Sequence, residues 1–346
     1  MSHTGIDLAN FDYNLPPELI ASKASTKRDQ SRLLVFDLKT GKLTDDYFFN
    51  LEKYLLANST LVVNESKVIP ARIKFSQNDK LLEILIAEQI SETTIKALVY
   101  PGKKFQPGQI IPVNEKLNLL AEVTEINDDG SRTITFNQKL TPELLEQIGK
   151  LPLPPYVKDT EDPDLLERYQ TVYAQKTGSI AAPTAGLHFT EELLNNIKKN
   201  HNLAKITLHV GLGTFKPIKT NNILEHKMHA ENYEINEENT NIINQTLEQK
   251  KPIIAVGTTT LRTLETQIRA HGKIIAGEDQ TDIFIYPGQK IASINGLITN
   301  FHLPKSSLFV LISALIGLDN AQAIYQHAIK KKYRFYSFGD ACLFLL

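Results

Sequence analysis

Two short, continuously apolar runs stand near the start of the chain, at residues 33–36 and 61–63. Apolar runs of this length between polar segments predict buried strands. The pattern changes between about residues 71 and 148, where apolar and polar residues alternate, as at Leu82, Ile84 and Ile86. Proline–glycine and aspartate–glycine pairs separate the alternating runs. This part of the chain therefore predicts a small antiparallel sheet or barrel.

Beyond the proline-rich stretch 151–155, strand-like and helix-like patterns alternate. The strand-like runs are Ile206–Val210, Ile253–Val256 and Ile283–Tyr286. The helix-like runs are Pro163 to about Gln175, Glu191–Lys199, Leu261–Ala270 and Leu308–Ile316. Asp162 is a suitable N-cap for the first of these helices, and Gly178 is expected to end it. An alternation of strands and helices is typical of α/β folds.

The two early strands match the later α/β region better than they match the segment between them. We therefore expect an α/β main domain made of residues 1–70 and 151–346. A small antiparallel β-barrel domain, residues 71–150, is expected to be inserted into it. The length of 346 residues agrees with about two domains.

Charge limits the kinds of partner that the protein can have. Lysine and arginine total 38 against 39 acidic residues, a net charge of −1, so the surface as a whole is not polycationic. A nucleic-acid site must then be a local basic patch. Candidate patches are Lys67 with Arg72 and Lys74, the pair Lys103 and Lys104, and Lys330–Lys332 with Arg334. The alternative for each patch is ordinary solvated surface charge.

The single cysteine, Cys342, allows neither an internal disulfide nor a multi-cysteine zinc site. The N-terminal region carries Asp7 and Asp12 and has no apolar signal segment. The most apolar stretch, 308–318, is too short to cross a bilayer as one helix. We therefore expect a cytoplasmic protein that does not bind a membrane, with no metal and as a monomer.

Two glycine-containing blocks allow a ligand to approach the backbone closely. The block 178–190 is rich in glycine and alanine and ends at Thr190, a suitable cap for the next helix. The block 209–215 contains a Gly-x-Gly but lacks the third glycine of a dinucleotide fingerprint. Phe215 can stack on a base or pack in the core. The alternative for both blocks is a tight connection between elements.

The block 252–262 combines an apolar strand, a glycine turn and a helix start. Backbone N–H groups and the hydroxyls of Thr258, Thr259 and Thr260 converge there, which favours an anion. No Gly-Lys pair follows, so the block is not a Walker loop. Arg262 lies in the first helical turn, where an anion nearby offsets its unfavourable interaction with the helix dipole.

Candidate proton-transfer groups are concentrated in the later part of the chain. His229, Glu231 and Tyr233 share one face if the run 226–233 is a strand. An imidazole beside a carboxylate suits acid–base catalysis or a metal, although His226, His229 and Glu231 match no zinc signature. The alternative is a hydrogen-bonded structural pair. Asp282 and His302 are further titratable candidates.

Nine blocks along the chain together resemble the S-adenosylmethionine:tRNA ribosyltransferase-isomerase family. They are Phe11–Ala21, Arg28–Leu34, Asn64–Arg72, Ala182–Phe189, Gly211–Phe215, His226–Glu231, Gly257–Glu265, Asn300–Pro304 and Tyr333–Asp340. Two departures are small: no proline precedes the Arg28-Asp29 pair where the family has one, and Phe338 replaces a usual tyrosine. The middle segment resembles the family only loosely.

The resemblance implies an α/β domain with an inserted barrel, and it implies a reaction. S-adenosylmethionine is the co-substrate, and its ribosyl group is transferred to 7-aminomethyl-7-deazaguanine at the wobble position of a tRNA anticodon and rearranged. The products are epoxyqueuosine-tRNA, adenine and methionine. A base must remove a proton from the ribose 5′ carbon beside the sulfonium, in a pocket poor in water. Catalytic candidates are His188, His229, Glu231, Asp282 and His302.

The remaining candidates divide between the two substrates. The S-adenosylmethionine candidates are Thr184, Gly186, Phe189, Gly211, Gly213, Thr214, Phe215, Gly257, Thr258, Thr259, Thr260 and Arg262, with Phe189 and Phe215 placed to sandwich a base. The tRNA candidates are Lys67, Arg72, Lys103, Lys104 and Arg334. Two alternatives from other classes are a metal-dependent hydrolase using His226, His229 and Glu231, and a non-catalytic RNA-binding protein.

Overall fold

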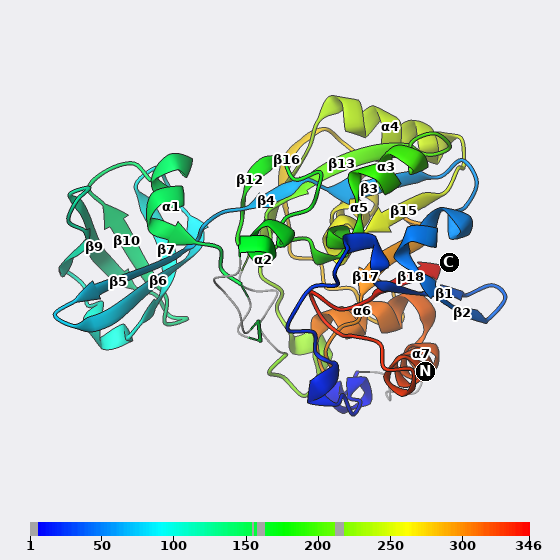
Figure 1. Ribbon diagram of the computed structural model, residues 1–346. Helices are drawn as coiled ribbons and strands as arrows, with labels where there is room; N and C mark the ends of the chain where they lie inside the picture. Colours follow the sequence, from blue (N-terminus) through cyan, green and yellow to red (C-terminus); the bar gives the residue numbers. More distant parts are fainter. Residues whose placement is uncertain (1–5, 154–155, 158–162, 212–217) are drawn as a thin grey trace. The chain divides into compact units, whose positions relative to one another are not determined.

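The computed structural model describes residues 6–153, 156–157, 163–211 and 218–346, with no side-chain description for 163–165. The chain divides into two compact units (Figure 1). The α/β unit comprises Met1–Ser66, Pro155–Lys176 and Ala182–Leu346. The β unit comprises Lys67–Pro154 and Thr177–Ala181. The expected discontinuous domain and the inserted barrel domain themselves stay predictions.

A nine-stranded mixed sheet forms the centre of the α/β unit. Its strand order is β16-β14-β13-β3-β15-β17-β18-β1-β2. In chain order the strands are β1 Arg32–Asp37, β2 Lys42–Tyr47, β3 Thr60–Asn64, β13 Asn202–Leu208, β14 Glu231–Ile235, β15 Ile253–Val256, β16 Gly277–Thr281, β17 Gly296–Asn300 and β18 Ala341–Leu345. The four neighbours β13, β3, β15 and β17 run parallel to one another.

Both faces of the central strands are covered, which explains their unbroken apolar sequences. Leu61 and Val63 of β3 pack into a core with residues of α3 (Glu191–Ile197) and of the 3₁₀ turn η5 (Phe48–Tyr54). The residues that alternate with them on β3 point to the other face. There Thr60 Oγ1 lies 2.6 Å from Thr246 Oγ1 of α4 (Glu237–Glu248). Alternate side chains of one strand thus serve two separate layers.

The helices begin and end at residues suited to those positions. Thr190 caps α3, Asn236 caps α4 and Ser306 caps α6 (Ser307–Ile316), each through a side-chain oxygen that accepts a backbone N–H. Helix α5 (Thr258–His271) follows Gly257 directly and ends at Gly272, which has a left-handed conformation. The remaining helices are α1 Pro142–Ile148, α2 Pro163–Arg168 and α7 Leu318–Lys330.

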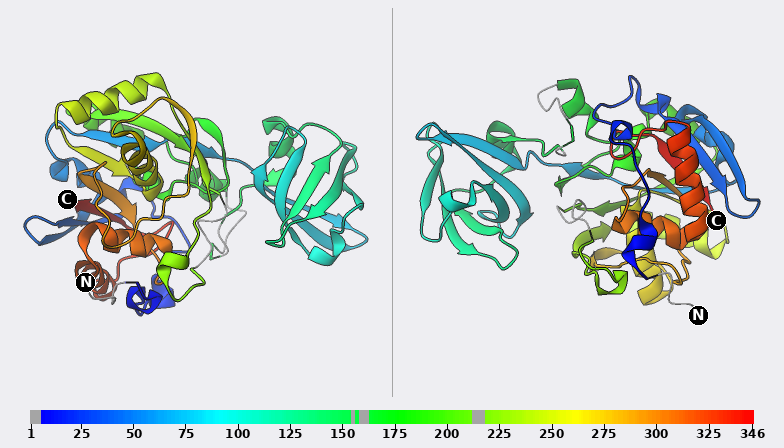
Figure 2. Two further views of the ribbon diagram at one scale, coloured as in Figure 1. Left: turned by 180° about the vertical axis from the view of Figure 1, so that it is seen from behind. Right: turned by 90° about the horizontal axis from the view of Figure 1, so that it is seen from below.

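The β unit contains a seven-stranded antiparallel sheet, strongly curled in every view (Figures 1 and 2). Its order is β11-β5-β6-β7-β10-β9-β8. The strands are β5 Arg72–Gln77, β6 Lys80–Gln89, β7 Thr94–Tyr100, β8 Ile110–Asn114, β9 Leu119–Ile126, β10 Arg132–Phe136 and β11 Gly149–Lys150. Leu82, Ile84 and Ile86 are all buried, so the predicted alternation is confirmed. Two short strands, β4 Ser66–Val68 and β12 Lys176–Ser179, form a separate pair.

Most predicted elements of the α/β region are confirmed, and two are wrong. The helix predicted to reach Gln175 ends at Arg168. Tyr169, Thr171 and Tyr173 are buried at every second position, which a helix cannot place on one face. The strand predicted at 283–286 does not form, because β14 pairs with the polar run of β16 just before it.

No single described helix is long and apolar enough to cross a bilayer; α6 and α7 reach that length and hydropathy only when counted together, and they meet at 115°.

Candidate functional site

One edge of the nine-stranded sheet gathers most of the candidate residues. The carboxyl ends of the parallel strands β13, β3, β15 and β17 meet there. Register places the start of β14 and the end of β16 at the same edge, since Glu231 lies opposite Thr281. It also places the start of β18 there, since Ala341 lies opposite Asn300. We call this the carboxyl edge, the usual place for a ligand in open α/β sheets.

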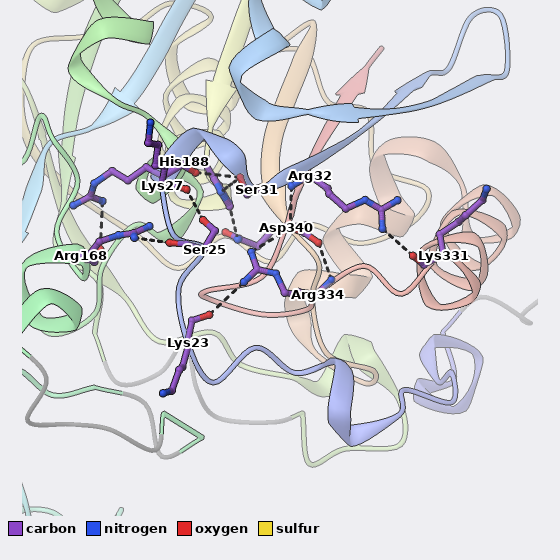
Figure 3. A network of polar contacts seen from close by, with 12 residues as sticks. Lys23, Ser25, Lys27, Ser31, Arg32, Arg168, His188, Lys331, Arg334 and Asp340 are labelled. Atoms are coloured by element: carbon purple, nitrogen blue, oxygen red, sulfur yellow. Dashed lines mark hydrogen bonds and ion pairs between the residues drawn. The ribbon is translucent and has the colours of Figure 1, made fainter.

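His188 lies at the carboxyl edge in a buried chain of hydrogen bonds. It ends the 3₁₀ turn η7 (Thr184–His188). Asn300 Nδ2 donates to His188 Nε2 at 3.0 Å, while Thr184 Oγ1 donates to Asn300 Oδ1 at 3.0 Å. Nε2 is therefore an acceptor, so the proton of the neutral ring is on Nδ1, which donates to Ser31 Oγ at 2.7 Å. Both ring nitrogens of His188 are thus engaged (Figure 3).

The surroundings of His188 keep its ring neutral at physiological pH. Burial, and after it the nearby guanidinium groups of Arg334, Arg168 and Arg28, together lower the pKa of His188 to about 3. His302 is buried as well, and burial lowers its pKa to about 3. Its Nε2 lies 2.9 Å from Thr299 Oγ1. Neither imidazole is suited to accept a proton at neutral pH.

Glu231 and Arg262 form a buried ion pair. Arg262 Nη1 donates to Glu231 Oε2, and the two side chains are only 6% and 7% exposed. Arg262 also donates to the carbonyl oxygens of Ile283 at 3.2 Å and Thr281 at 3.3 Å. Glu231 Oε1 accepts the N–H of Gly211 at 3.1 Å. The anion that offsets the charge of Arg262 is therefore a carboxylate of the protein itself.

The glycine turn before α5 is partly occupied by internal contacts. Thr260 is fully buried, and its hydroxyl donates to the carbonyl of Val256 at 2.8 Å. Thr259 Oγ1 accepts from Asn64 Nδ2 at 3.3 Å. Gly257 has a φ of +91°, a conformation that favours glycine. Of the three threonine hydroxyls expected to converge on an anion, those of Thr259 and Thr260 are thus bonded to protein groups. The anion site at this turn stays a prediction.

Two catalytic candidates at this edge are exposed. Asp282 follows β16 directly, and His229 precedes β14 by two residues. Among the described residues, no group of three or more histidine, cysteine, aspartate or glutamate side chains is placed to hold a metal ion. The His226 ring instead packs edge-on against Phe284, with ring centroids 5.2 Å apart.

Phe189 does not fit the expected stacking role. Its side chain is fully buried, with the Phe48 ring centroid at 4.9 Å and that of Tyr173 at 6.3 Å. The ring is a core residue of the α/β unit, with no face left for a ligand. Its supposed partner Phe215 lies outside the described residues, as do Gly213 and Thr214.

Gly186 has a packing reason to be glycine. A Cβ at this position would lie 2.0 Å from Tyr173 Oη and 2.7 Å from Thr171 Cγ2, both on buried side chains. We expect Gly186→Ala to lower the free energy of unfolding by about 1–3 kcal/mol, as overpacking does. Urea unfolding measures this. Gly211→Ala is the control, since no atom of the described residues lies within 4 Å of its added Cβ. Equal losses in the two variants would contradict the prediction.

The tRNA candidates lie in both units. Lys67, Arg72, Lys103 and Lys104 belong to the β unit, where Arg72 Nε lies 3.4 Å from Glu83 Oε1. Arg334 belongs to the α/β unit, and its Nη2 lies 3.3 Å from Asp340 Oδ1. Four of the five candidates thus belong to the β unit and one to the α/β unit.

Sequence reasoning missed several residues that organise the carboxyl edge. Asn64, at the end of β3, donates to the carbonyl of Leu208 at 2.9 Å and accepts the N–H of the same residue at 3.0 Å. Asn300 and Ser31 hold the two nitrogens of His188. Asn64 and Asn300 each begin one of the nine blocks that resemble the family. A polar amide at the end of an apolar strand could therefore have identified them as site residues.

Comparisons with known proteins agree over almost the whole chain. Residues 8–344 match a family model described as queuosine biosynthesis protein. An S-adenosylmethionine:tRNA ribosyltransferase-isomerase from Fusobacterium nucleatum is 47% identical over 338 residues, covering 96% of this chain and 95% of that protein. A protein of the same name from Natranaerobius thermophilus is 45% identical over 340 residues, covering 96% and 98%.

A solved structure is similar as well. The crystal structure of an S-adenosylmethionine tRNA ribosyltransferase from Thermotoga maritima has 34% sequence identity and a TM-score of 0.55. The match covers 97% of this chain and 100% of that one. The resemblance inferred from the nine sequence blocks is confirmed, and the chain belongs to the S-adenosylmethionine:tRNA ribosyltransferase-isomerase family of queuosine biosynthesis proteins.

Proposed function

We propose that this protein transfers the ribosyl group of S-adenosylmethionine to 7-aminomethyl-7-deazaguanine at the wobble position of a tRNA anticodon and isomerises it. The products are epoxyqueuosine-tRNA, adenine and methionine. The observation that carries the proposal is the 47% identity, over 96% of the chain, to a relative with this activity in its name. S-adenosylmethionine and tRNA are then both substrates of the enzyme.

The carboxyl edge is the proposed site of the chemistry. The reaction needs a base for the ribose 5′ carbon, a proton donor for the departing adenine and an uncharged acceptor amine. We assign proton transfer to the exposed pair Asp282 and His229. His188, His302 and Glu231 act as positioning groups, because both ring nitrogens of His188, Nε2 of His302 and both carboxylate oxygens of Glu231 already contact protein groups.

The S-adenosylmethionine site is proposed around the turns at the same edge. The backbone N–H groups at the start of α5, from Gly257 to Thr260, favour the carboxylate of the methionine part. The η7 turn and the turn at Gly257 lie close together, since a Cβ on Gly257 would be 3.8 Å from Ala185 Cβ. The other proposed contacts are Thr184, Gly211, Gly213, Thr214 and Phe215, with Arg262 acting through Glu231.

The β unit is proposed to contribute tRNA contacts through Lys67, Arg72, Lys103 and Lys104. We also propose that residues 71–150 form an inserted barrel domain. Its strand order leaves β11 and β8 as the two edges of the hydrogen-bonded sheet. The strong curl of that sheet (Figure 2) supports the barrel, because closure of a sheet requires its edges to approach each other.

The decisive experiment incubates the protein with S-adenosylmethionine and tRNA carrying the 7-aminomethyl base. We expect adenine and epoxyqueuosine to appear in equal amounts. Absence of both, under conditions where the tRNA binds, would reject the proposal and favour a non-catalytic RNA-binding protein. Loss of activity on addition of a chelator would favour a metal-dependent enzyme instead.

A further inference from the structure

A basic cluster lies on the α/β unit beside His188. It consists of Lys23, Lys27, Arg28, Arg168 and Arg334, which come from the N-terminal segment, the end of α2 and the turn before β18. Figure 3 shows Lys23, Arg168 and Arg334 around one stretch of backbone. Segments far apart in the sequence thus bring three arginines together around His188, and the adjoining N-terminal segment carries the two lysines.

The arginines of the cluster are fixed by carbonyl oxygens. Arg28 donates to the carbonyls of Glu167, Arg168 and Leu187, each at 3.3 Å. Arg168 in return donates to the carbonyls of Ser25 and Thr26. A guanidinium bonded to neutral carbonyls keeps its full positive charge. These bonds hold Arg28 and Arg168 in place relative to each other.

Three members of the cluster, Lys23, Lys27 and Arg28, differ from Arg334 in their ion pairing. Within the part of the chain that the structure describes, Lys23, Lys27 and Arg28 form no ion pair with an acidic side chain, and both lysines are exposed. Arg334 pairs with Asp340, whose buried carboxylate also accepts the N–H of Arg32 at 3.0 Å. Burial first, and then the neighbouring Arg168, lower the pKa of Arg28, while the nearby carboxylate of Glu167 raises it.

A shallow hollow opens within the cluster. Its lining includes Ser25, Arg28, Arg168, His188 and Ser337. The neutral His188 ring therefore lies under the cations, at the end of the η7 turn that reaches the carboxyl edge. A row of phosphates crossing the cluster would thus pass beside the part of the carboxyl edge where β17 ends and β1 begins. Two exposed lysines beside fixed arginines suit several phosphates in succession better than a single carboxylate.

We propose that this basic cluster binds the phosphodiester backbone of the substrate tRNA. The proposal rests on the proposed function for the identity of the RNA. None of the sequence candidates except Arg334 belongs to this surface, so it adds a tRNA contact region on the α/β unit itself. Its contribution is electrostatic and independent of base sequence.

The test uses the full chain with Lys23→Glu and Lys27→Glu combined. The matched control combines Lys251→Glu and Lys273→Glu, which gives the same net charge. Both control lysines are exposed. Lys251 precedes β15 and Lys273 follows α5, so both lie at the amino ends of the parallel strands. Arg32, which follows the cluster residue Arg28 in sequence, starts β1 at the carboxyl edge. Binding of an unmodified tRNA transcript, without S-adenosylmethionine, is measured at several NaCl concentrations.

We expect the cluster variant to bind tRNA roughly tenfold more weakly than the control, with a shallower salt dependence, by about 0.9 in slope for each phosphate that the variant no longer neutralises. Equal affinity and slope in the two variants would overturn the proposal. So would a raised KM for S-adenosylmethionine with unchanged tRNA binding, which would assign the cluster to the methionine carboxylate. Because binding is measured without turnover, a wild-type protein that releases no adenine but shows this difference would overturn only the proposed function.

Discussion

The Glu231→Gln variant is expected to lose about 3–5 kcal/mol of unfolding free energy, the usual result of removing one partner from a buried ion pair. Glutamine keeps an oxygen for the N–H of Gly211 but leaves the buried guanidinium of Arg262 without its carboxylate. Urea unfolding measures the loss. The control is Glu234→Gln on the same strand, where the ion pair with Lys176 is partly exposed and contributes at most about 1 kcal/mol.

A double-mutant cycle separates the ion pair from the other effects of the substitution. Combining Glu231→Gln with Arg262→Met removes both charges, so the double variant should be more stable than the sum of the single losses predicts. Strict additivity would contradict the pairing. Adenine release per folded molecule gives the second readout. A fall of about 10²–10⁴-fold, typical for loss of a general base, would restore Glu231 to a direct catalytic role.

The strands of the α/β unit could be predicted because burial on both faces requires nearly unbroken apolar sequence. This holds for β1, β3 and β15. The helix after Pro163 was predicted too long because Asp162, Pro163 and Gly178 suggested clear ends. The intervening side chains instead bury at Tyr169, Thr171 and Tyr173, and the N–H of Gln175 bonds to the carbonyl of Glu65. Such a long-range contact leaves no periodic signal in the sequence.

The candidate site was located by its blocks, but its internal pairing could not be. Which carboxylate meets Arg262 depends on the register of β13, β14 and β16. His188 and Asn300 are 112 residues apart, and only the strand order brings them together. Sequence alone therefore named the polar residues of the carboxyl edge without showing that several are already bonded to one another.

Stability should fall as the pH falls from about 6.5 toward 3. His188 and His302 have pKa values of about 3 in the folded protein and ordinary values near 6.5 when unfolded. Above pH 6.5 both states carry neutral rings, so the histidines produce no pH dependence. Below it the unfolded chain binds protons that the folded chain excludes, at about 1.4 kcal/mol per pH unit for each histidine. The loss is complete once the folded rings also protonate.

The His302→Gln variant tests this directly. We expect the slope of unfolding free energy against pH, measured between pH 6 and 4.5, to decrease by about 1.4 kcal/mol per pH unit. Most carboxyl groups titrate below this interval and so contribute little to the slope. Burial also lowers the pKa values of His209 and His226, which contribute to the slope that remains in the variant. The slope is informative even if the substitution lowers stability at every pH. His271→Gln, at an exposed position, is the control; equal slopes for the two variants would show that His302 takes up a proton in the folded protein.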